Sequence, residues 1–413
     1  MRSVRGLFVY PWDLLSEGVD QTIERISGEL GCTALALNCN YHSGRFLHPR
    51  HRDGGLVPTL RGVINHREGA GAAFTPNPAR YGQGPLPLRE APLADARVIE
   101  RASAAARRVG LGLNFWVVVL HSSSLGAAHP ELSVRNLYGD RFRFALCPAQ
   151  PRVRDYARGL VDDLCAQFQP DWLMLESPTY LGLVHGDHHE LILANLDELA
   201  KLLLGLCFCE ACQERAAALG ISVREVLVAA RKLSDRLIED ERGGLDPMFT
   251  ASETVSALLA FPELYAYLRM RGDTVTSLLA ELRSIATAYG VRTGVTSSIF
   301  TRPASKAWME GTELRSAAAA VDSLLTVSYF PDPAAVRGDI RWVKGLIEGQ
   351  PFQVALNAGY PDALSEVNLV TKALIAAEEG ATGVFYYNYG LLTHERLRWV
   401  AAANAALAAR ESL

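Results

Sequence analysis

The sequence lacks several features that would place it in a specialised class of protein. Its most apolar stretch, residues 111–120, falls far short of the roughly 20 residues that a membrane-spanning helix needs. The formal net charge of -4 gives no excess of positive charge for binding nucleic acid or an anionic membrane. The apolar stretch near the N-terminus is short and is interrupted at Pro11, which argues against a signal peptide. We therefore expect a cytoplasmic protein without nucleic-acid or membrane partners.

A secreted framework of disulfide bonds is also excluded as the basis of the fold. The chain has seven cysteines, an odd number, spread over 413 residues. With 49% hydrophobic and 21% charged residues, its composition is that of a globular protein with a large core. Hydrophobic burial is therefore expected to stabilise the chain.

Eight short apolar segments are typical of buried parallel strands, because they are rich in β-branched and aromatic residues and are bounded by turn residues. They are residues 6–10, 34–38, 112–120, 172–175, 293–296, 324–328, 352–356 and 383–387. Helical patterns separate most of them, at residues 19–30, 95–109, 153–168, 274–289, 339–349, 366–380 and 393–410. This alternation predicts an α/β fold, a single (β/α)8 TIM barrel over residues 1–413.

Two long segments interrupt the alternation and are predicted to be insertions. Residues 41–93 follow the second strand, are rich in Gly, Pro, Arg and His, and are expected to fold over the barrel mouth as a loop. Residues 190–262 follow the fourth strand and have a strongly helical pattern. Barrel enzymes differ from one another mainly in such loops at the C-terminal ends of the strands.

Side chains that directly follow barrel strands point into the active site. Here they are carboxylates, imidazoles, aromatic rings and amides, a mixture that suits a sugar-sized ligand rich in hydroxyl groups. Hydrolysis of a glycosidic bond needs a proton donor near the leaving oxygen and a base or nucleophile on the other side of the sugar. Asp13, His121 and Glu176 are the candidates for these catalytic roles.

Other polar residues after the strands are candidates for binding the substrate. They are His42, Arg45, His48, His185, His189, Arg302, Asn357, Tyr387 and Asn388. His185 and His189 belong to a histidine-rich stretch without the spacing of zinc hydrolases, so it is expected to line the substrate site. Asn357 stands where many barrel hydrolases carry a second carboxylate, which favours an unusual catalytic pair.

Cys207, Cys209 and Cys212 form a C-x-C-x-x-C arrangement. Three thiolates this close together can bind a structural zinc ion if a fourth ligand comes from elsewhere, and Cys147 and Cys165 lie upstream. The motif is similar to one in some family 42 β-galactosidases, in which an upstream cysteine completes a structural zinc site. Buried thiols without metal, or an occasional disulfide, are the alternative. Neither interpretation places catalysis here, and no cofactor is expected to be required for it.

Several motifs together resemble the glycoside hydrolase-like barrels. They are Tyr10-Pro-Trp-Asp13, Tyr41-His42 with Arg45-Phe-Leu-His48, His121-Ser-Ser-Ser, Ala145-Leu-Cys-Pro148, Leu175-Glu-Ser-Pro178, His185-Gly-Asp-His-His189 and Cys207-Phe-Cys-Glu-Ala-Cys212. Among named families, the chain is similar to family 156, inverting exo-sialidases built on a (β/α)8 barrel. That family uses an aspartate after strand one and a histidine after strand three, the places of Asp13 and His121.

The resemblance implies an inverting hydrolysis of a terminal sialic acid or related acidic sugar. His121 would protonate the leaving oxygen and Asp13 would activate water, or the two roles would be exchanged, with Glu176 positioning the sugar. The carboxylate of such a sugar calls for an arginine clamp, for which Arg45, Arg302 and Arg135 are the candidates.

Three alternatives stay open. If the enzyme retains configuration, Glu176 becomes the acid/base residue. A lyase or isomerase of the Schiff-base type needs a lysine at a strand end, and the lysines here fall in predicted helices or loops. A non-catalytic carbohydrate-binding barrel would bind a sugar without turning it over. A homodimer is compatible with a barrel, although no motif indicates one.

Overall fold

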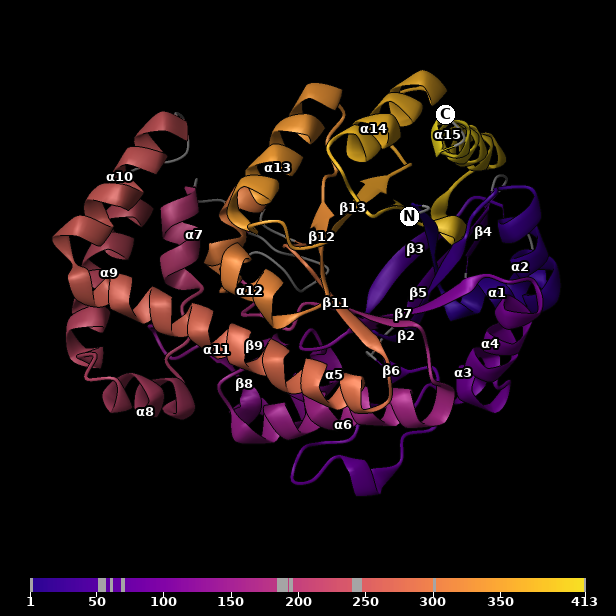
Figure 1. The fold of residues 1–413 in the computed structure, drawn as a ribbon. Helices are drawn as coiled ribbons and strands as arrows, with labels where there is room; N and C mark the ends of the chain where they lie inside the picture. Colours follow the sequence, from indigo (N-terminus) through magenta and orange to yellow (C-terminus); the bar gives the residue numbers. More distant parts are fainter. Residues whose placement is uncertain are drawn as a thin grey trace.

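Eight parallel strands close into a barrel in the computed structural model, which describes residues 3–50, 57–59, 62–67, 71–183, 192, 196–239, 247–299 and 302–411. The ring closes because β1 pairs with β2 on one side and with β14 on the other. The barrel strands are β1 (Val4–Val9), β2 (Ala34–Tyr41), β7 (Gly112–Val118), β10 (Trp172–Glu176), β11 (Arg292–Thr296), β12 (Ser323–Val327), β13 (Phe352–Asn357) and β14 (Gly383–Tyr387). The predicted (β/α)8 barrel is thus confirmed (Figure 1).

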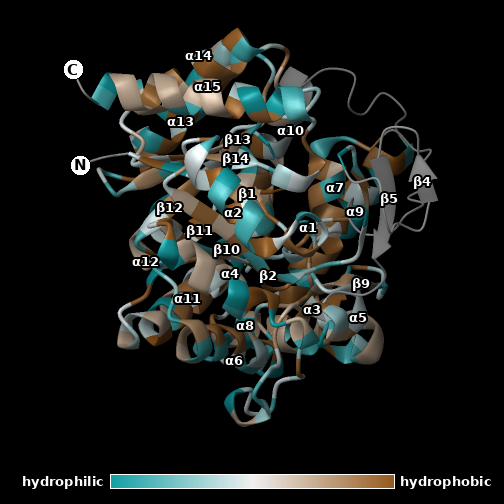
Figure 2. Cartoon of the chain, turned by 90° about the vertical axis from the view of Figure 1, so that its right-hand side faces the viewer, coloured by the Kyte–Doolittle hydropathy of each residue, from teal (hydrophilic) through white to brown (hydrophobic). Residues whose placement is uncertain are grey.

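Helices surround the barrel, each burying one face against the strands. They are α2 (Val19–Gly28), α4 (Val98–Arg108), α6 (Pro151–Phe168), α11 (Pro262–Ala288), α12 (Leu314–Ala320), α13 (Pro333–Leu346), α14 (Glu366–Glu378) and α15 (His394–Glu411). In α4, Ile99 and Ala102 are fully buried while Arg101 and Arg108 are exposed. Figure 2 shows the apolar colour on the central strands and mixed colours on the outer helices. This division between faces is what fixes each helix against the barrel.

Two helices differ from their predicted ranges for local reasons. The helix predicted over 95–109 begins only at Val98, as α4, because Arg97 takes a left-handed conformation with φ of 51°; the separate short helix α3 (Ala91–Asp95) precedes it. Helix α11 begins at Pro262, well before the predicted residue 274, and a proline is well tolerated in the first turn of a helix. Its early start lets α11 contact both the barrel and the helical insertion.

The insertion over residues 41–93 contains short strands, where a loop was expected. β3 (Gly44–His48), β5 (Gly62–Arg67) and β4 (Val57–Thr59) form a small antiparallel sheet, and β6 (Gly71–Ala72) pairs with the end of β2. A single turn, η1 (Pro78–Arg80), follows. Arg50 Nη1 donates to the carbonyl oxygen of Tyr389 at 2.7 Å, so the start of the insertion packs on the segment after β14.

The helical insertion has a hydrophobic core of its own. It consists of α7 (Glu198–Leu204), α8 (Glu210–Ala218), α9 (Val223–Glu239) and α10 (Pro247–Ala260). Leu203, Val226, Leu264 and Tyr267 are fully buried in this core. Figure 1 shows these helices beside the barrel, with α11 running from them along it. The long helix α11 therefore joins the two cores.

Between β7 and α6 the chain forms a smaller addition, which consists of α5 (Ser123–Ala128), η2 (Pro130–Leu132) and a hairpin of β8 (Ser133–Arg135) and β9 (Arg141–Leu146).

The two ends of the described chain meet where Arg5 Nη1 lies 3.2 Å from Glu411 Oε2. Among the described residues, every helix is too short or too polar to cross a membrane.

Candidate functional site

Glu176 is the last residue of β10 and lies at the C-terminal mouth of the barrel. Its side chain is nearly buried, and Oε2 accepts a hydrogen bond of 2.6 Å from Trp116 Nε1 on the neighbouring strand β7. Burial raises the pKa of Glu176 to about 7; the Trp116 hydrogen bond opposes this change and the negative charge of Glu310 adds to it. The carboxyl group is therefore poised to give up or take up a proton near neutral pH.

Aromatic side chains with hydroxyl groups surround Glu176. The Tyr10 hydroxyl lies 2.6 Å from the Tyr387 hydroxyl and 3.0 Å from the Tyr41 hydroxyl. The Trp116 ring packs edge-on against Tyr41 and Tyr387, with ring centroids 5.2 Å and 5.9 Å apart. Burial, with a smaller contribution from Glu176, raises the pKa of Tyr41 and Tyr387. These phenols thus stay neutral and can act as hydrogen-bond donors.

The structure brings together His42 and His121, which follow β2 and β7. Their rings stack with centroids 4.0 Å apart, and the His42 ring also stacks on Tyr41 at 4.1 Å. Burial lowers the pKa of His42 to about 4, against a weaker effect of the hydrogen bond with the Ser43 carbonyl. His42 is therefore neutral near pH 7, and a neutral imidazole can accept a proton.

Asp13 lies in helix α1 (Pro11–Glu17), which begins directly after β1. Its side chain is fully buried, Oδ2 accepts a hydrogen bond from Tyr10 N at 3.1 Å, and Oδ1 lies 3.4 Å from His48 Nδ1. A Cβ atom on Gly390 would lie only 2.0 Å from Oδ1, so a glycine is needed there. Asp13 thus holds together the end of β1, the first insertion and the segment after β14.

The predicted arginines lie in three different places. The Arg302 guanidinium lies 5.4 Å from the centre of the Tyr329 ring, which itself is 6.0 Å from Tyr387. Arg45 is exposed on β3 of the first insertion. Arg135 lies on β8, and its Nη2 donates to Phe208 O at 2.7 Å. Arg302 thus contacts the aromatic residues of the mouth through the Tyr329 ring.

Two further predicted binding residues, Asn357 and Asn388, lie at the ends of β13 and β14. Asn357 Nδ2 donates to Asp362 at 2.7 Å, and its Oδ1 accepts from Gly359 N at 2.8 Å, so it shapes its own loop. Asn388 is buried and its Oδ1 accepts from Gly390 N at 3.2 Å, at the start of η4 (Tyr389–Leu391). His185 and His189 lie outside the described residues.

Glu310 is a buried carboxylate that the sequence analysis missed. It ends η3 (Ala304–Glu310), the short helical segment after β11, and its side chain is 2% exposed. Its Oε1 accepts a hydrogen bond from Ser298 Oγ at 2.7 Å, and its carbonyl oxygen accepts one from Tyr180 N at 2.9 Å. Glu310 lies well beyond the end of β11 along the chain. The rule that side chains directly following a barrel strand point into the site, called the strand-end rule below, therefore could not predict it.

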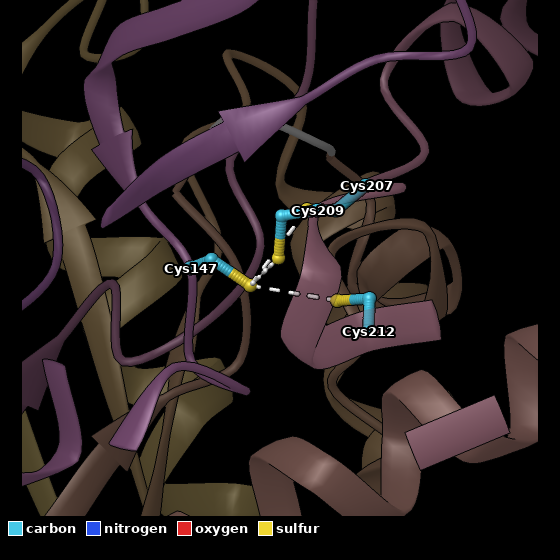
Figure 3. Close-up of side chains that lie close together, drawn as sticks. All are labelled: Cys147, Cys207, Cys209 and Cys212. Carbon is cyan, nitrogen blue, oxygen red and sulfur yellow. Dashed lines mark hydrogen bonds between the residues drawn. The ribbon is translucent and has the colours of Figure 1, made fainter. Parts of the chain in front are cut away.

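A cluster of four buried cysteines lies between the barrel and the helical insertion. The sulfur atoms of Cys147, Cys207, Cys209 and Cys212 all lie within 4.8 Å of one another and are buried (Figure 3). Cys147 follows β9, whereas the other three lie around the start of α8. The structure therefore supplies Cys147 as a fourth sulfur, while Cys165 lies in α6 outside the group.

The spacing of the four sulfurs fits a tetrahedral metal site better than a disulfide. Cys147 Sγ lies 3.5 Å from Cys212 Sγ, 3.6 Å from Cys209 Sγ and 3.7 Å from Cys207 Sγ. A tetrahedral zinc ion with Zn–S bonds of about 2.3 Å would separate its sulfur ligands by about 3.8 Å, whereas a disulfide needs about 2.05 Å. The four thiols thus match a four-cysteine zinc site in ligand type and spacing.

Solved glycosidases share this barrel fold at low sequence identity. The α-L-fucosidase isoenzyme 2 from Paenibacillus thiaminolyticus is 11% identical with a TM-score of 0.56, over 100% of this chain and 50% of that one. The PgaB (BpsB) glycoside hydrolase domain from Bordetella bronchiseptica is 15% identical with a TM-score of 0.55, over 97% and 98%. A β-galactosidase from Marinomonas ef1 is 11% identical with a TM-score of 0.58, over 97% and 58%.

This chain thus spans about half the length of the fucosidase and 58% of the galactosidase. No family model matches the chain, and no curated protein matches it. At these identities the likeness shows the fold alone.

Proposed function

We propose that this protein hydrolyses the glycosidic bond of a terminal sugar bound at the C-terminal mouth of its barrel. The proposal is carried by the surroundings of Glu176. Its carboxyl group is buried among aromatic rings and phenol hydroxyls, and burial raises its pKa to about 7. Aromatic faces stack on sugar rings, and hydroxyl groups bond to sugar hydroxyls. The fold shared with glycosidases supports the same reaction class.

In the proposed reaction Glu176 is the general acid. Below about pH 7 its carboxyl group holds a proton, which passes to the departing oxygen as the bond from that oxygen to the anomeric carbon breaks. The hydroxyl of a water molecule adds to the anomeric carbon, and the remaining proton of that water passes to a base. Glu176 then regains a proton from solvent and the base releases its proton to solvent, which completes the cycle.

The sequence predicted His121 and Asp13 as the acid and the base, in either order, with Glu176 positioning the sugar. With Glu176 as the acid, we assign the base to Asp13, which would activate the water, or to His121. The resemblance to the family 156 exo-sialidases supports this pair, an inverting outcome and a sialic acid or related acidic sugar. We assign the carboxylate of such a sugar to Arg302, and the contact of its guanidinium with Tyr329, 5.4 Å from the ring centre, supports this assignment. If configuration is retained instead, Glu176 serves as the acid/base residue and a nucleophile replaces the activated water.

The test is release of a fluorescent leaving group from a panel of aryl glycosides that includes the sialoside. Wild type is compared with Glu176→Gln, Asp13→Asn and His121→Ala, and Glu225→Gln on the exposed face of α9 is the matched control. Turnover of one substrate that collapses in Glu176→Gln but not in the control supports the proposal. Activity that survives Glu176→Gln refutes the assigned acid, and an absence of turnover on every glycoside favours the non-catalytic sugar-binding barrel.

We further propose that Cys147, Cys207, Cys209 and Cys212 bind one structural zinc ion. The spacing of their sulfurs and their complete burial support this proposal. Bound zinc would hold the loop after β9 to the start of α8 and would take no part in the reaction. Elemental analysis of the purified protein tests this, and a metal content far below one zinc per chain would refute it.

A further inference from the structure

Glu310 and Glu176 lie at the same end of two neighbouring barrel strands. Strand β10 pairs with β11 up to Leu175 and Val295, so Glu176 lies next to Thr296 when the register is continued. Ser298 follows two residues later, and its hydroxyl donates to Glu310 Oε1 at 2.7 Å. The Glu310 carboxylate is thereby held at the mouth, beside the strand that carries Glu176.

The loop after β10 fixes Glu310 from the other side. Tyr180, four residues beyond Glu176, donates its backbone N–H to the carbonyl oxygen of Glu310 at 2.9 Å. The two glutamates are 6% and 2% exposed, so water screens their charges poorly. Two carboxylates in such a place cannot both ionise without a large cost, and one of them tends to keep a proton.

The surrounding groups decide which of the two keeps it. Within the described part of the chain, the groups that face Glu176 are Trp116, Tyr41, Tyr387, Tyr329 and Glu310, with Arg302 over the ring of Tyr329. The three tyrosines are neutral, because burial raises their pKa values. Each carboxyl group accepts one hydrogen bond, Glu176 from Trp116 and Glu310 from Ser298, so these donors do not distinguish the two. The buried guanidinium of Arg271 donates to the carbonyl oxygen of Met309, the residue before Glu310, and this positive charge favours the ionised form of Glu310.

We propose that Glu310 is a positioning residue that acts through Glu176, keeping it protonated so that it can donate to the departing sugar oxygen. This role rests on the proposed glycosidase function. After Glu176 has given its proton away, the repulsion between the two carboxylates favours uptake of a new proton by Glu176 from solvent. Glu310 itself neither contacts the sugar nor gains or loses a proton in this cycle.

The experiment measures the protonation state of Glu176 as a function of pH and does not require the protein to turn over a substrate. The full chain is labelled with 5-fluorotryptophan, and its 19F NMR spectrum is recorded as a function of pH. The chain has six tryptophans, so Trp116→Phe identifies the resonance of the indole that is bonded to Glu176. Glu176→Gln shows which pH-dependent change of that resonance belongs to Glu176.

We expect Glu310→Gln to move the midpoint of this change to lower pH by about one pH unit or more, because a like charge is removed. Ser298→Ala removes a hydrogen bond that stabilises the ionised form of Glu310. We expect this variant to move the midpoint in the same direction by a smaller amount. Glu310→Asp, which keeps the charge, should leave the midpoint close to that of wild type. With an active substrate, the alkaline limb of the kcat profile should move in parallel.

An unchanged midpoint in both Glu310→Gln and Ser298→Ala would overturn the inference. An equal displacement in Glu310→Asp and Glu310→Gln would also overturn it, because the effect would then come from packing and not from charge. If no glycoside is turned over, the proposed glycosidase function fails while the measured midpoint still decides whether Glu310 controls the protonation of Glu176.

Discussion

Replacement of Glu176 by glutamine should stabilise the protein at alkaline pH. The folded state holds the proton of Glu176 with a pKa of about 7, above the usual value of 4.5, so folding opposes its ionisation. This penalty is absent when the pH is below the pKa of Glu176 in the unfolded chain. It grows as the pH rises from that pKa and is complete above about pH 7. At about 1.36 kcal/mol per pH unit, the full penalty is about 3 kcal/mol.

Glutamine removes the charge while its side-chain oxygen can still accept the Trp116 hydrogen bond. For a 413-residue chain with an unfolding entropy of about 2.1 cal/mol/K per residue, a gain of about 3 kcal/mol raises the melting temperature by about 4 °C. Scanning calorimetry at about pH 8 should show this rise. At about pH 5 the gain should fall below about 1 kcal/mol, because little of the penalty has developed.

Glu379→Gln is the matched control with the opposite sign. Although burial acts in the other direction, Arg337 and Arg341 hold the pKa of Glu379 below its usual value, at contact distances of 2.7 Å and 2.9 Å. The ionised Glu379 side chain stabilises the fold when the pH is above the pKa that Glu379 has in the unfolded chain, and this contribution is lost as the pH falls. Glu379→Gln should therefore lower the melting temperature at about pH 8. A Glu176→Gln variant that gains equally at both pH values, or loses stability at about pH 8, would refute the reasoning.

Three further predictions concern packing, metal and substrate. Gly390→Ala would press a Cβ against the Asp13 carboxylate and should cost about 1–3 kcal/mol in thermal unfolding, whereas Gly338→Ala, in open space on α13, should gain up to about 1 kcal/mol. Cys147→Ser should reduce bound zinc on elemental analysis, and Cys165→Ser should retain it; equal zinc in both would contradict the assigned ligands. Arg302→Ala should raise KM about 10- to 100-fold for an acidic sugar but not for a neutral one, and an unchanged KM for both would exclude it as the carboxylate ligand.

The barrel could be predicted because its signal is local. Each strand is a short run of apolar residues between turn residues, and the fully buried β2 shows why, since both of its faces lie against protein. The small sheet in the first insertion could not be predicted in the same way. β3 alternates between buried and exposed side chains over only five residues, too short a pattern to separate from a loop.

Only the candidate site residues that directly follow a barrel strand could be predicted from the sequence. The strand-end rule found Glu176, and it found His42 and His121, whose rings stack although 79 residues separate them in the chain. It did not find Glu310, whose place depends on the bonds to Ser298 and Tyr180. The rule also says which residues follow a strand but not what their side chains contact, so it gave no sign that Asn357 bonds to Asp362.

Tyr180 connects two parts of the molecule that have been described separately. Its backbone N–H holds Glu310, its hydroxyl lies 3.5 Å from Cys212 Sγ, and the guanidinium of Arg271 lies 4.6 Å from the centre of its ring. A single residue, Tyr180, thus contacts both Glu310 and the thiol cluster. On the proposed functions, we expect oxidation of the four thiols or loss of the zinc ion to displace Tyr180 and, with it, Glu310.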